Sequence, residues 1–156
     1  MEKQSVKGQI GVVGGGSCSP DIYELAREVG VEIAKRGYRL VCGGLAGVME
    51  AACRGAREAG GMTIGILPGV DKQDANPFVD VIIPTGLGHA RNILVVHASD
   101  ALIAIDGGAG TLSEIAIALK VGKPVVGIRT WDLDGKVVMA TRGGEAVALV
   151  TERLTE

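Results

Sequence analysis

The stretch ALIAIDGGAGTLSEIAIALKVG, residues 101–122, joins an apolar run, a glycine-rich turn and a segment of helical period. The run at 101–105 is apolar at every position, which is typical of a strand buried on both faces of a parallel sheet. The apolar residues of 112–121 recur at intervals that predict a helix. Because a strand that turns directly into a helix is part of a βαβ unit, this stretch predicts an α/β fold.

The same alternation extends over the rest of the chain. Ser19 as N-cap and Pro20 at the first helical position begin the first expected helix, and Gly37 ends it. We expect strands at 9–13, 39–42, 63–67, 79–84, 101–105 and 124–128, and helices at 21–36, 48–59, 90–98, 112–121 and 144–154. This pattern predicts a doubly wound parallel sheet in three αβα layers, a Rossmann-like nucleotide-binding fold in a single domain over 1–156.

Composition restricts the class of protein. A hydrophobic share of 47% with 22% charged residues is typical of a soluble globular protein. The N-terminus lacks the apolar core of a secretory signal, and no apolar run approaches the roughly 20 residues of a membrane span, so we expect a cytoplasmic protein without a membrane partner. A net charge of −2 and an aromatic share of 3% argue against a nucleic-acid partner. Three cysteines without CxxC spacing predict no metal site.

Glycine is concentrated where three expected strands end: GGGS follows the first strand, GGLAG the second and DGGAGT the fifth. The carboxyl ends of parallel strands lie along one edge of the sheet, where open α/β folds bind ligands. Glycine lets backbone N–H groups approach an anion, and the helix that follows adds favourable partial charge. We therefore expect a small phosphorylated ligand at this edge. The expected contacts are Gly15, Gly16, Ser17, Gly43, Gly44, Gly47, Gly107, Gly108, Gly110 and Thr111.

Two common phosphate motifs do not fit. Gly14, Gly16 and Ser19 form only part of a GxGxxG fingerprint, and the second strand ends in CGG instead of an acid that would bind ribose. The turn GGAGTLSE also lacks the GK[ST] of a P-loop. The sequence therefore argues against a dinucleotide-dependent dehydrogenase and against a P-loop nucleoside triphosphatase.

Thr111 and Glu114 have the spacing of a capping box, in which each side chain accepts a hydrogen bond from the backbone N–H of the other. A capping box does not explain why the glycine-rich stretch GGAG directly precedes Thr111. Alternatively, Glu114 faces an electron-poor centre beside a bound phosphate, where a carboxylate stabilises positive charge or activates water. The residues themselves leave both interpretations open.

Three motifs in this order resemble one family over nearly the whole chain: VVGGGSCSPDIYELA, GYRLVCGGLAGVMEAACRGAREAGGMTIGILPG and HARNILVVHASDALIAIDGGAGTLSEIAIALKVGKPV. They are similar to the Lonely Guy family and its relatives, whose pattern is GGxxGxM and then HxR followed by PGGxGTxxE. The resemblance implies a homodimer or higher homo-oligomer, and phosphoribohydrolase activity that releases the base from a nucleoside 5′-monophosphate. It places the essential arginine at Arg91 and the essential glutamate at Glu114, and the phosphate loop at 107–111. His89 precedes the arginine and is an open candidate for the site.

Two residues depart from the hydrolase pattern. Asp106 stands where the hydrolases have proline, and Asn92 follows the arginine where they have lysine. The carboxylate of Asp106 either bears on the phosphate geometry or simply begins an Asp-Gly turn. These features and the short chain look more like the branch of molybdenum cofactor carrier proteins, which hold a pterin phosphate without turnover. We therefore expect a phosphoribohydrolase-type N-glycosidase that needs no cofactor, or alternatively a carrier whose bound ligand is the molybdenum cofactor. In both cases Asn92 belongs to the ligand site.

Overall fold

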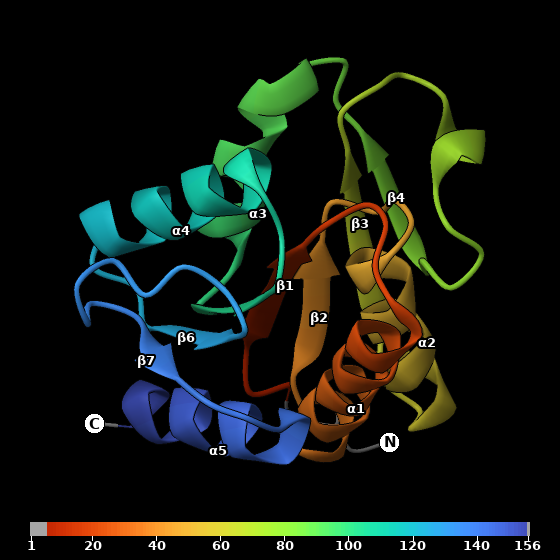
Figure 1. The fold of residues 1–156 in the computed structure, drawn as a ribbon. Helices are drawn as coiled ribbons and strands as arrows, with labels where there is room; N and C mark the ends of the chain where they lie inside the picture. Colours follow the sequence, from red (N-terminus) through yellow and green to blue (C-terminus); the bar gives the residue numbers. More distant parts are fainter. Residues whose placement is uncertain (1–5, 156) are drawn as a thin grey trace.

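The computed structural model of the protein describes residues 6–155, which form one parallel sheet with helices on both faces (Figure 1). Its seven strands lie in the order β4-β3-β2-β1-β5-β6-β7. The strands are β1 (Gln9–Gly14), β2 (Arg39–Cys42), β3 (Thr63–Leu67), β4 (Val81–Pro84), β5 (Ala101–Ile105), β6 (Val125–Ile128) and β7 (Val138–Met139). The helices are α1 (Pro20–Lys35), α2 (Val48–Glu58), α3 (Arg91–Ala98), α4 (Ala109–Lys120) and α5 (Gly143–Leu154). The expected doubly wound Rossmann-like fold is confirmed.

The helices divide into two layers that bury opposite faces of the sheet. Side chains of α1, α2 and α5 pack in one hydrophobic cluster with one face, and those of α3 and α4 pack in a second cluster with the other. All five residues of β5 are buried, as the apolar run predicts for a strand covered on both sides. The sheet therefore forms a rigid platform whose carboxyl edge carries the turns.

The strand order reverses direction between β1 and β5. From β1 the chain proceeds outward through β2 and β3 to β4, returns through α3, and enters β5 on the other side of β1. The connections after β1 and β5 consequently leave the sheet toward opposite faces. This is the point at which open α/β sheets form a ligand crevice.

Three details differ from the sequence expectations. Helix α4 begins at Ala109, with Gly108 as its N-cap, which is three residues earlier in the sequence than expected. Strand β7 was not expected, because two residues are too short to show a periodic pattern. The strand expected at 79–84 begins only at Val81, and the connection before it contains a 3-10 turn, Lys72–Asp74.

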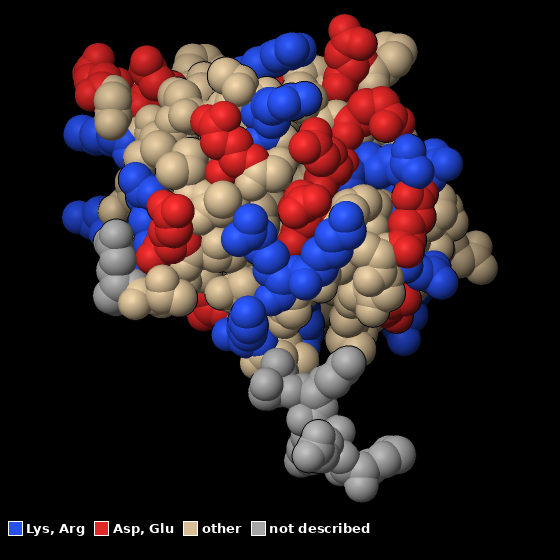
Figure 2. Space-filling view, turned by 90° about the horizontal axis from the view of Figure 1, so that it is seen from below, with Lys and Arg blue, Asp and Glu red and all other residues tan. Residues whose placement is uncertain are grey.

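Charge is evenly mixed on the face that Figure 2 shows, where Lys and Arg alternate with Asp and Glu and neutral residues lie between them. That face presents no broad basic surface of the kind that a nucleic-acid backbone would require. Among residues 6–155 no helix is long and apolar enough to cross a membrane.

Candidate ligand site at the carboxyl edge

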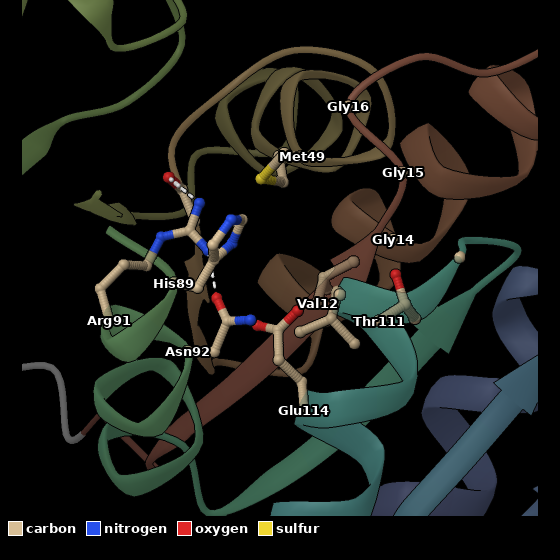
Figure 3. Close-up of a pocket in the computed structure, with 14 residues that line it drawn as sticks. Val12, Gly14, Gly15, Gly16, Met49, His89, Arg91, Asn92, Thr111 and Glu114 are labelled. Atoms are coloured by element: carbon tan, nitrogen blue, oxygen red, sulfur yellow. Dashed lines mark hydrogen bonds between the residues drawn. The ribbon is translucent and has the colours of Figure 1, made fainter. Parts of the chain in front are cut away.

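A cavity of about 220 Å³ opens at the carboxyl ends of β1 and β2, against the first turns of α3 and α4 (Figure 3). Backbone from the glycine-rich turns forms one part of its wall, and the side chains of Arg91, Asn92 and Glu114 form another. The cavity is lined by Val12, Val13, Gly14, Gly15, Gly16, Gly43, Met49, His89, Arg91, Asn92, Gly108, Gly110, Thr111 and Glu114. The structure thus brings together residues that lie up to a hundred positions apart in sequence.

Most of the residues expected from the sequence line this cavity, and four do not. Those that line it are Gly15, Gly16, Gly43, Arg91, Asn92, Gly108, Gly110, Thr111 and Glu114. Ser17, Gly44, Gly47 and Gly107 lie outside the lining, although they belong to the turns that form the wall. Each of these three glycines has a positive φ, so their contribution is to the shape of the turns.

The turn after β5 presents open backbone toward the helix start. Gly107 has a φ of 92°, and a Cβ at this position would overlap the side chain of Thr111. At Gly108 and Gly110, in contrast, a Cβ would meet nothing within 4 Å. Since the first N–H groups of a helix have no partner within it, the start of α4 offers free donors in open space. This part of the site suits an anion.

The capping-box interpretation of Thr111 is wrong. Gly108 caps α4, and Thr111 is the third residue inside the helix, where its side chain is buried against Gly107. The prediction failed because glycine was taken as part of the turn, whereas Ala109 and Gly110 already have helical geometry. Glu114 is therefore nearly two turns into the helix and cannot serve as a reciprocal cap.

The glycine turns after β1 and β2 contact each other through their backbone atoms. The N–H of Val48, at the start of α2, donates to the carbonyl oxygen of Gly15 at 3.0 Å. Gly47 has a φ of 65°, and a Cβ there would overlap the same Gly15 carbonyl. One donor at the start of α2 is thus already occupied, which leaves α4 as the more open helix start in this cavity.

Gly44 fulfils a different structural requirement. Its N–H donates to the Sγ of Cys42 at 3.3 Å, and its carbonyl accepts the backbone N–H of Asn76 at 2.9 Å. The polar connection before β4 is thereby attached to the end of β2. Gly44 therefore lies outside the cavity lining and holds the second glycine turn through its bonds to Cys42 and Asn76.

Arg91, the first residue of α3, reaches across the cavity toward the second glycine turn (Figure 3). Its guanidinium donates to the side-chain oxygen of Asn92 and, at 3.5 Å, to the carbonyl of Gly43. Among the residues that the structure describes, its Nε is the one buried side-chain nitrogen or oxygen without a hydrogen-bond partner. Burial lowers the pKa of Arg91, and the charge of Glu114 opposes this effect. A buried guanidinium with a free donor suits an anionic ligand.

Asn92 connects the starts of two helices. Its side-chain oxygen accepts from Arg91, and its Nδ2 donates to the Oγ of Ser113 at 3.1 Å. The hydroxyl of Ser113 in turn donates to the carbonyl of Gly110 at 2.7 Å. Only 5% of Asn92 is exposed, so this chain of hydrogen bonds holds Arg91 in place relative to α4.

Glu114 is buried in the wall of the cavity, beside Val12 and Asn92 (Figure 3). It is 6% exposed, and the nearby lining includes Val12 and Val13. Burial raises the pKa of its carboxyl to about 7, and the positive charge of Arg91 offsets only part of this increase. No ion pair within 4 Å joins these two described residues. The cavity therefore separates a cation from a carboxyl group that retains its proton to nearly neutral pH.

Five residues of the lining were not assigned to the site from the sequence: Val12, Val13, Gly14, Met49 and His89. His89 was an open candidate, and it lies in the wall beside Arg91. Met49 was not selected, although it occupies the first turn of the helix that follows the second glycine turn. The signal for Met49 in the sequence was its position directly after Gly47 and Val48, in the first turn of the expected helix. No group of three or more His, Cys, Asp or Glu is placed to hold a metal ion within residues 6–155.

Asp106 begins a left-handed turn. Its φ is 52° and that of Gly107 is 92°, which is backbone geometry that an Asp-Gly turn can adopt. A proline at this position could not adopt this φ, because its ring holds φ near −65°. Burial raises the pKa of the Cys18 thiol, and the charges of Asp106 and Glu50 raise it further. Asp106 and Glu50 therefore lie close enough to the first glycine turn for their charges to raise the pKa of Cys18.

The fold and the site together define a Rossmann-like protein with a glycine-rich cavity at the carboxyl edge of its sheet. The model of the SLOG cluster4 family matches residues 7–154, and the chain belongs to this family. The family is related to the Lonely Guy phosphoribohydrolases and to the molybdenum cofactor carrier proteins, which confirms the resemblance seen in the motifs.

Two solved structures and one relative are similar to this chain over at least 78% of its length. The molybdenum cofactor binding protein from Rippkaea orientalis is 39% identical, with a TM-score of 0.89 over 95% of this chain and 98% of that one. The molybdenum cofactor carrier protein of Chlamydomonas reinhardtii is 38% identical, with a TM-score of 0.87 over 96% and 99%. An uncharacterized protein of Archaeoglobus fulgidus is 52% identical over 78% of this chain and 80% of its own length.

A relative with a named activity is the cytokinin riboside 5′-monophosphate phosphoribohydrolase of Mycobacterium tuberculosis. It is 38% identical over 71% of this chain, and the match spans 64% of the relative's length. The similarity to the cofactor-binding proteins thus extends over nearly the whole of both chains, whereas more than a third of the hydrolase has no counterpart in the match.

Proposed function

We propose that the protein binds the molybdenum cofactor, a phosphorylated pterin, and carries it without turnover. The observation that carries this proposal is the similarity over 95% and 96% of the chain to two proteins named for binding this cofactor. The hydrolase expected first from the motifs becomes the second candidate.

The phosphate of the ligand lies at the start of α4. The free N–H groups of this helix and the open space over Gly108 and Gly110 suit a phosphate, and Arg91 contributes positive charge from α3. Arg91 lines the cavity and forms no ion pair within 4 Å with the described residues, which leaves its positive charge to a ligand phosphate.

Glu114 contacts the heterocycle of the ligand. A carboxyl group whose pKa is about 7 is largely protonated below that pH, and it then donates a hydrogen bond to a carbonyl oxygen or ring nitrogen. The same proton weakens the group as a source of negative charge, which a ribosyl cation would require. This chemistry favours recognition of a ring over stabilisation of a cation.

The test is reconstitution with cofactor released from a molybdoenzyme under anaerobic conditions. We expect the wild type to retain about one pterin per chain after gel filtration, detected by mass spectrometry, and Arg91→Ala to retain far less. Arg54→Ala is the matched control, because Arg54 bonds Glu58 on the surface of α2. Equal retention by the wild type and Arg91→Ala, or none by either, would contradict the proposal.

The second candidate is a phosphoribohydrolase acting on nucleoside 5′-monophosphates. It is favoured by one observation, namely that Arg91 and Glu114 face one cavity without pairing. In this reaction the oxygen of water bonds C1′ of the ribose as the bond from C1′ to the base breaks. The base leaves with a proton from Glu114, and the proton that water loses returns to the Glu114 carboxylate. With AMP the products are adenine and ribose 5-phosphate.

Chromatography of AMP incubated with the protein tests this activity. Release of adenine that falls at least about 100-fold in Glu114→Gln would support the hydrolase, because a positioned acid contributes on this order or more. Glu145→Gln, on the exposed side of α5, is the control. No release by the wild type removes this candidate and leaves the carrier proposal unaffected.

We further propose that the protein is a homo-oligomer. The edge strand β4 exposes Val81 and Ile83, and the neighbouring helix α3 exposes Ile93 and Leu94. Because Ile82 points to the cluster of α1 and α2, Val81 and Ile83 face the same side of the sheet as α3. Exposed apolar surface next to an unpaired strand edge is typical of an interface. Light scattering should give a multiple of 16.0 kDa that Ile83→Glu reduces.

A further inference from the structure

The segment that follows β6 is attached to the turn between β5 and α4. The Oγ1 of Thr130 donates to the carbonyl of Asp106 at 2.7 Å, and the indole Nε1 of Trp131 donates to the carbonyl of Gly108 at 3.3 Å. The N–H of Asp106 donates to the carbonyl of Ile128 at 3.0 Å. Three hydrogen bonds therefore hold this turn from one side.

These bonds determine how two peptide planes are oriented. Every peptide bond in the described residues is trans, so each carbonyl points opposite to the N–H of the same plane. The Asp106 carbonyl points to Thr130, so the N–H of Gly107 points away from it. The Gly108 carbonyl accepts the N–H of Leu112 within α4 at 3.0 Å as well as the indole of Trp131, so Trp131 adds to the helix in turning the N–H of Ala109 away. Neither Thr130 nor Trp131 lines the cavity, and Gly107 and Ala109 are the chain neighbours of its lining residue Gly108.

Unusual backbone conformations are concentrated in these two segments. Within residues 6–155, the non-glycine residues with positive φ are Asp106, Arg129, Leu133 and Asp134, with values from 50° to 57°. One begins the turn after β5, and the other three belong to the connection after β6. Such conformations persist only where surrounding contacts hold them, and they cluster at ligand sites.

We infer that Thr130 and Trp131 are positioning residues, which hold the N–H groups of Gly107 and Ala109 toward the ligand phosphate. This inference rests on the proposed phosphate site at the start of α4. Neither side chain contacts the phosphate, and both act through the carbonyl groups that they bind. Trp131 is 42% exposed, and its indole is bonded to the carbonyl of Gly108, which lines the cavity.

The inference is tested by titration with inorganic phosphate. Trp131 is the only tryptophan of the chain, so a change in fluorescence on adding phosphate reports from this turn alone. Thr130→Val removes the hydroxyl donor and keeps the shape of the side chain, and Trp131→Phe removes the indole donor and keeps an aromatic ring. We expect each variant to bind phosphate roughly fivefold more weakly by calorimetry, since one hydrogen bond to a loop carbonyl is lost.

A spectroscopic measurement separates positioning from a general loss of stability. In the wild type, phosphate should shift the amide NMR resonances of Gly107 and Ala109. These shifts should shrink in both variants at saturating phosphate, and Thr141→Val should retain them. Thr141 is a matched control, because its hydroxyl bonds Glu145 near the start of α5. Circular dichroism identifies a variant that fails to fold, and the other variant then decides the test.

The outcomes distinguish this inference from the function on which it rests. Absence of phosphate-induced shifts in the wild type would overturn the phosphate site and with it the positioning role. Wild-type binding that both variants reproduce, in affinity and in the two amide shifts, would overturn the positioning role alone.

Discussion

Between α1 and α2 glycine removes atoms from a packed contact, whereas at the start of α4 it leaves space over the backbone. A Cβ at Gly30 of α1 would overlap the carbonyl of Ala52, and one at Gly55 of α2 would overlap that of Arg27. A Cβ at Gly108 or Gly110 would meet nothing within 4 Å. The same residue type therefore allows close helix packing in one region and access to N–H groups in the other.

This difference shows why the number of glycines does not identify a site. The helix contact is closed on both sides, and its glycines affect the free energy of unfolding. The start of α4 is open, and its glycines affect what can bind. The two regions should respond in opposite ways to an added methyl group, and the following predictions test this contrast.

The largest effect should come from Gly30→Ala. The new methyl group overlaps backbone that cannot move without separating α1 from α2, so we expect a loss of about 3 kcal/mol in the free energy of unfolding. Urea denaturation measures this loss. Gly16→Ala is the control in the open region, where nothing lies within 4 Å, and it should change stability by less than about 0.5 kcal/mol. Similar losses in both variants would remove the contrast.

The second prediction concerns the open region and pH. The pKa of Glu114 is about 4.5 when unfolded and about 7 when folded. Below pH 4.5 both states carry the proton, and between these values only the folded state keeps it. The free energy of unfolding should therefore fall by about 3 kcal/mol as pH rises from 4.5 to 7, and then remain level.

Urea midpoints of the wild type and Glu114→Gln, measured from pH 4.5 to 8, test this slope. The variant cannot titrate at this position, so its stability relative to the wild type should increase across the window. Parallel curves for the two proteins would show that Glu114 titrates normally.

Arg91→Ala should weaken phosphate binding by roughly 10- to 100-fold, because hydrogen bonds from a charged group contribute about 1.5–3 kcal/mol. The expected change in the free energy of unfolding is small, since its guanidinium bonds only Asn92 and Gly43. Calorimetry with inorganic phosphate provides the comparison. A large loss of stability with unchanged affinity would place Arg91 with the packing region instead.

The smallest effect should come from Gly110→Ala. Alanine is favoured over glycine in a helix by roughly 0.5–1 kcal/mol, and the space above Gly110 is open, so thermal unfolding should shift upward slightly. The methyl group also enters the space proposed for phosphate, and affinity should fall a few-fold. A rise in stability with loss of binding is the opposite of the result expected at Gly30.

Much of the fold could be predicted from local pattern. The buried strand at 101–105, the Ser-Pro start of α1 and the alternation of strands with helices are all visible along the chain. The start of α4 was placed three residues late, because Gly110 lowers helix propensity while the structure supplies helical geometry. The short strand β7 depends on pairing with β6, which no local pattern shows.

The candidate site was predicted in part. The glycine edges, Arg91 and Glu114 were identified from motif and spacing, and all these turns meet at one edge. Met49 lines the cavity only because α2 begins beside the first turn, and Gly44 and Gly47 lie behind the wall. Which glycine faces a ligand depends on neighbours that are distant in sequence.

The sequence by itself determined the βαβ alternation and the family, because periodicity and motif are properties of adjacent residues. Only the tertiary structure decided which groups lack partners. The free Nε of Arg91, the raised pKa of Glu114 and the hydrogen bonds from Thr130 and Trp131 all depend on contacts between separate elements. Burial and hydrogen bonding are set by what packs against a group, and that becomes defined only when the strands are assembled.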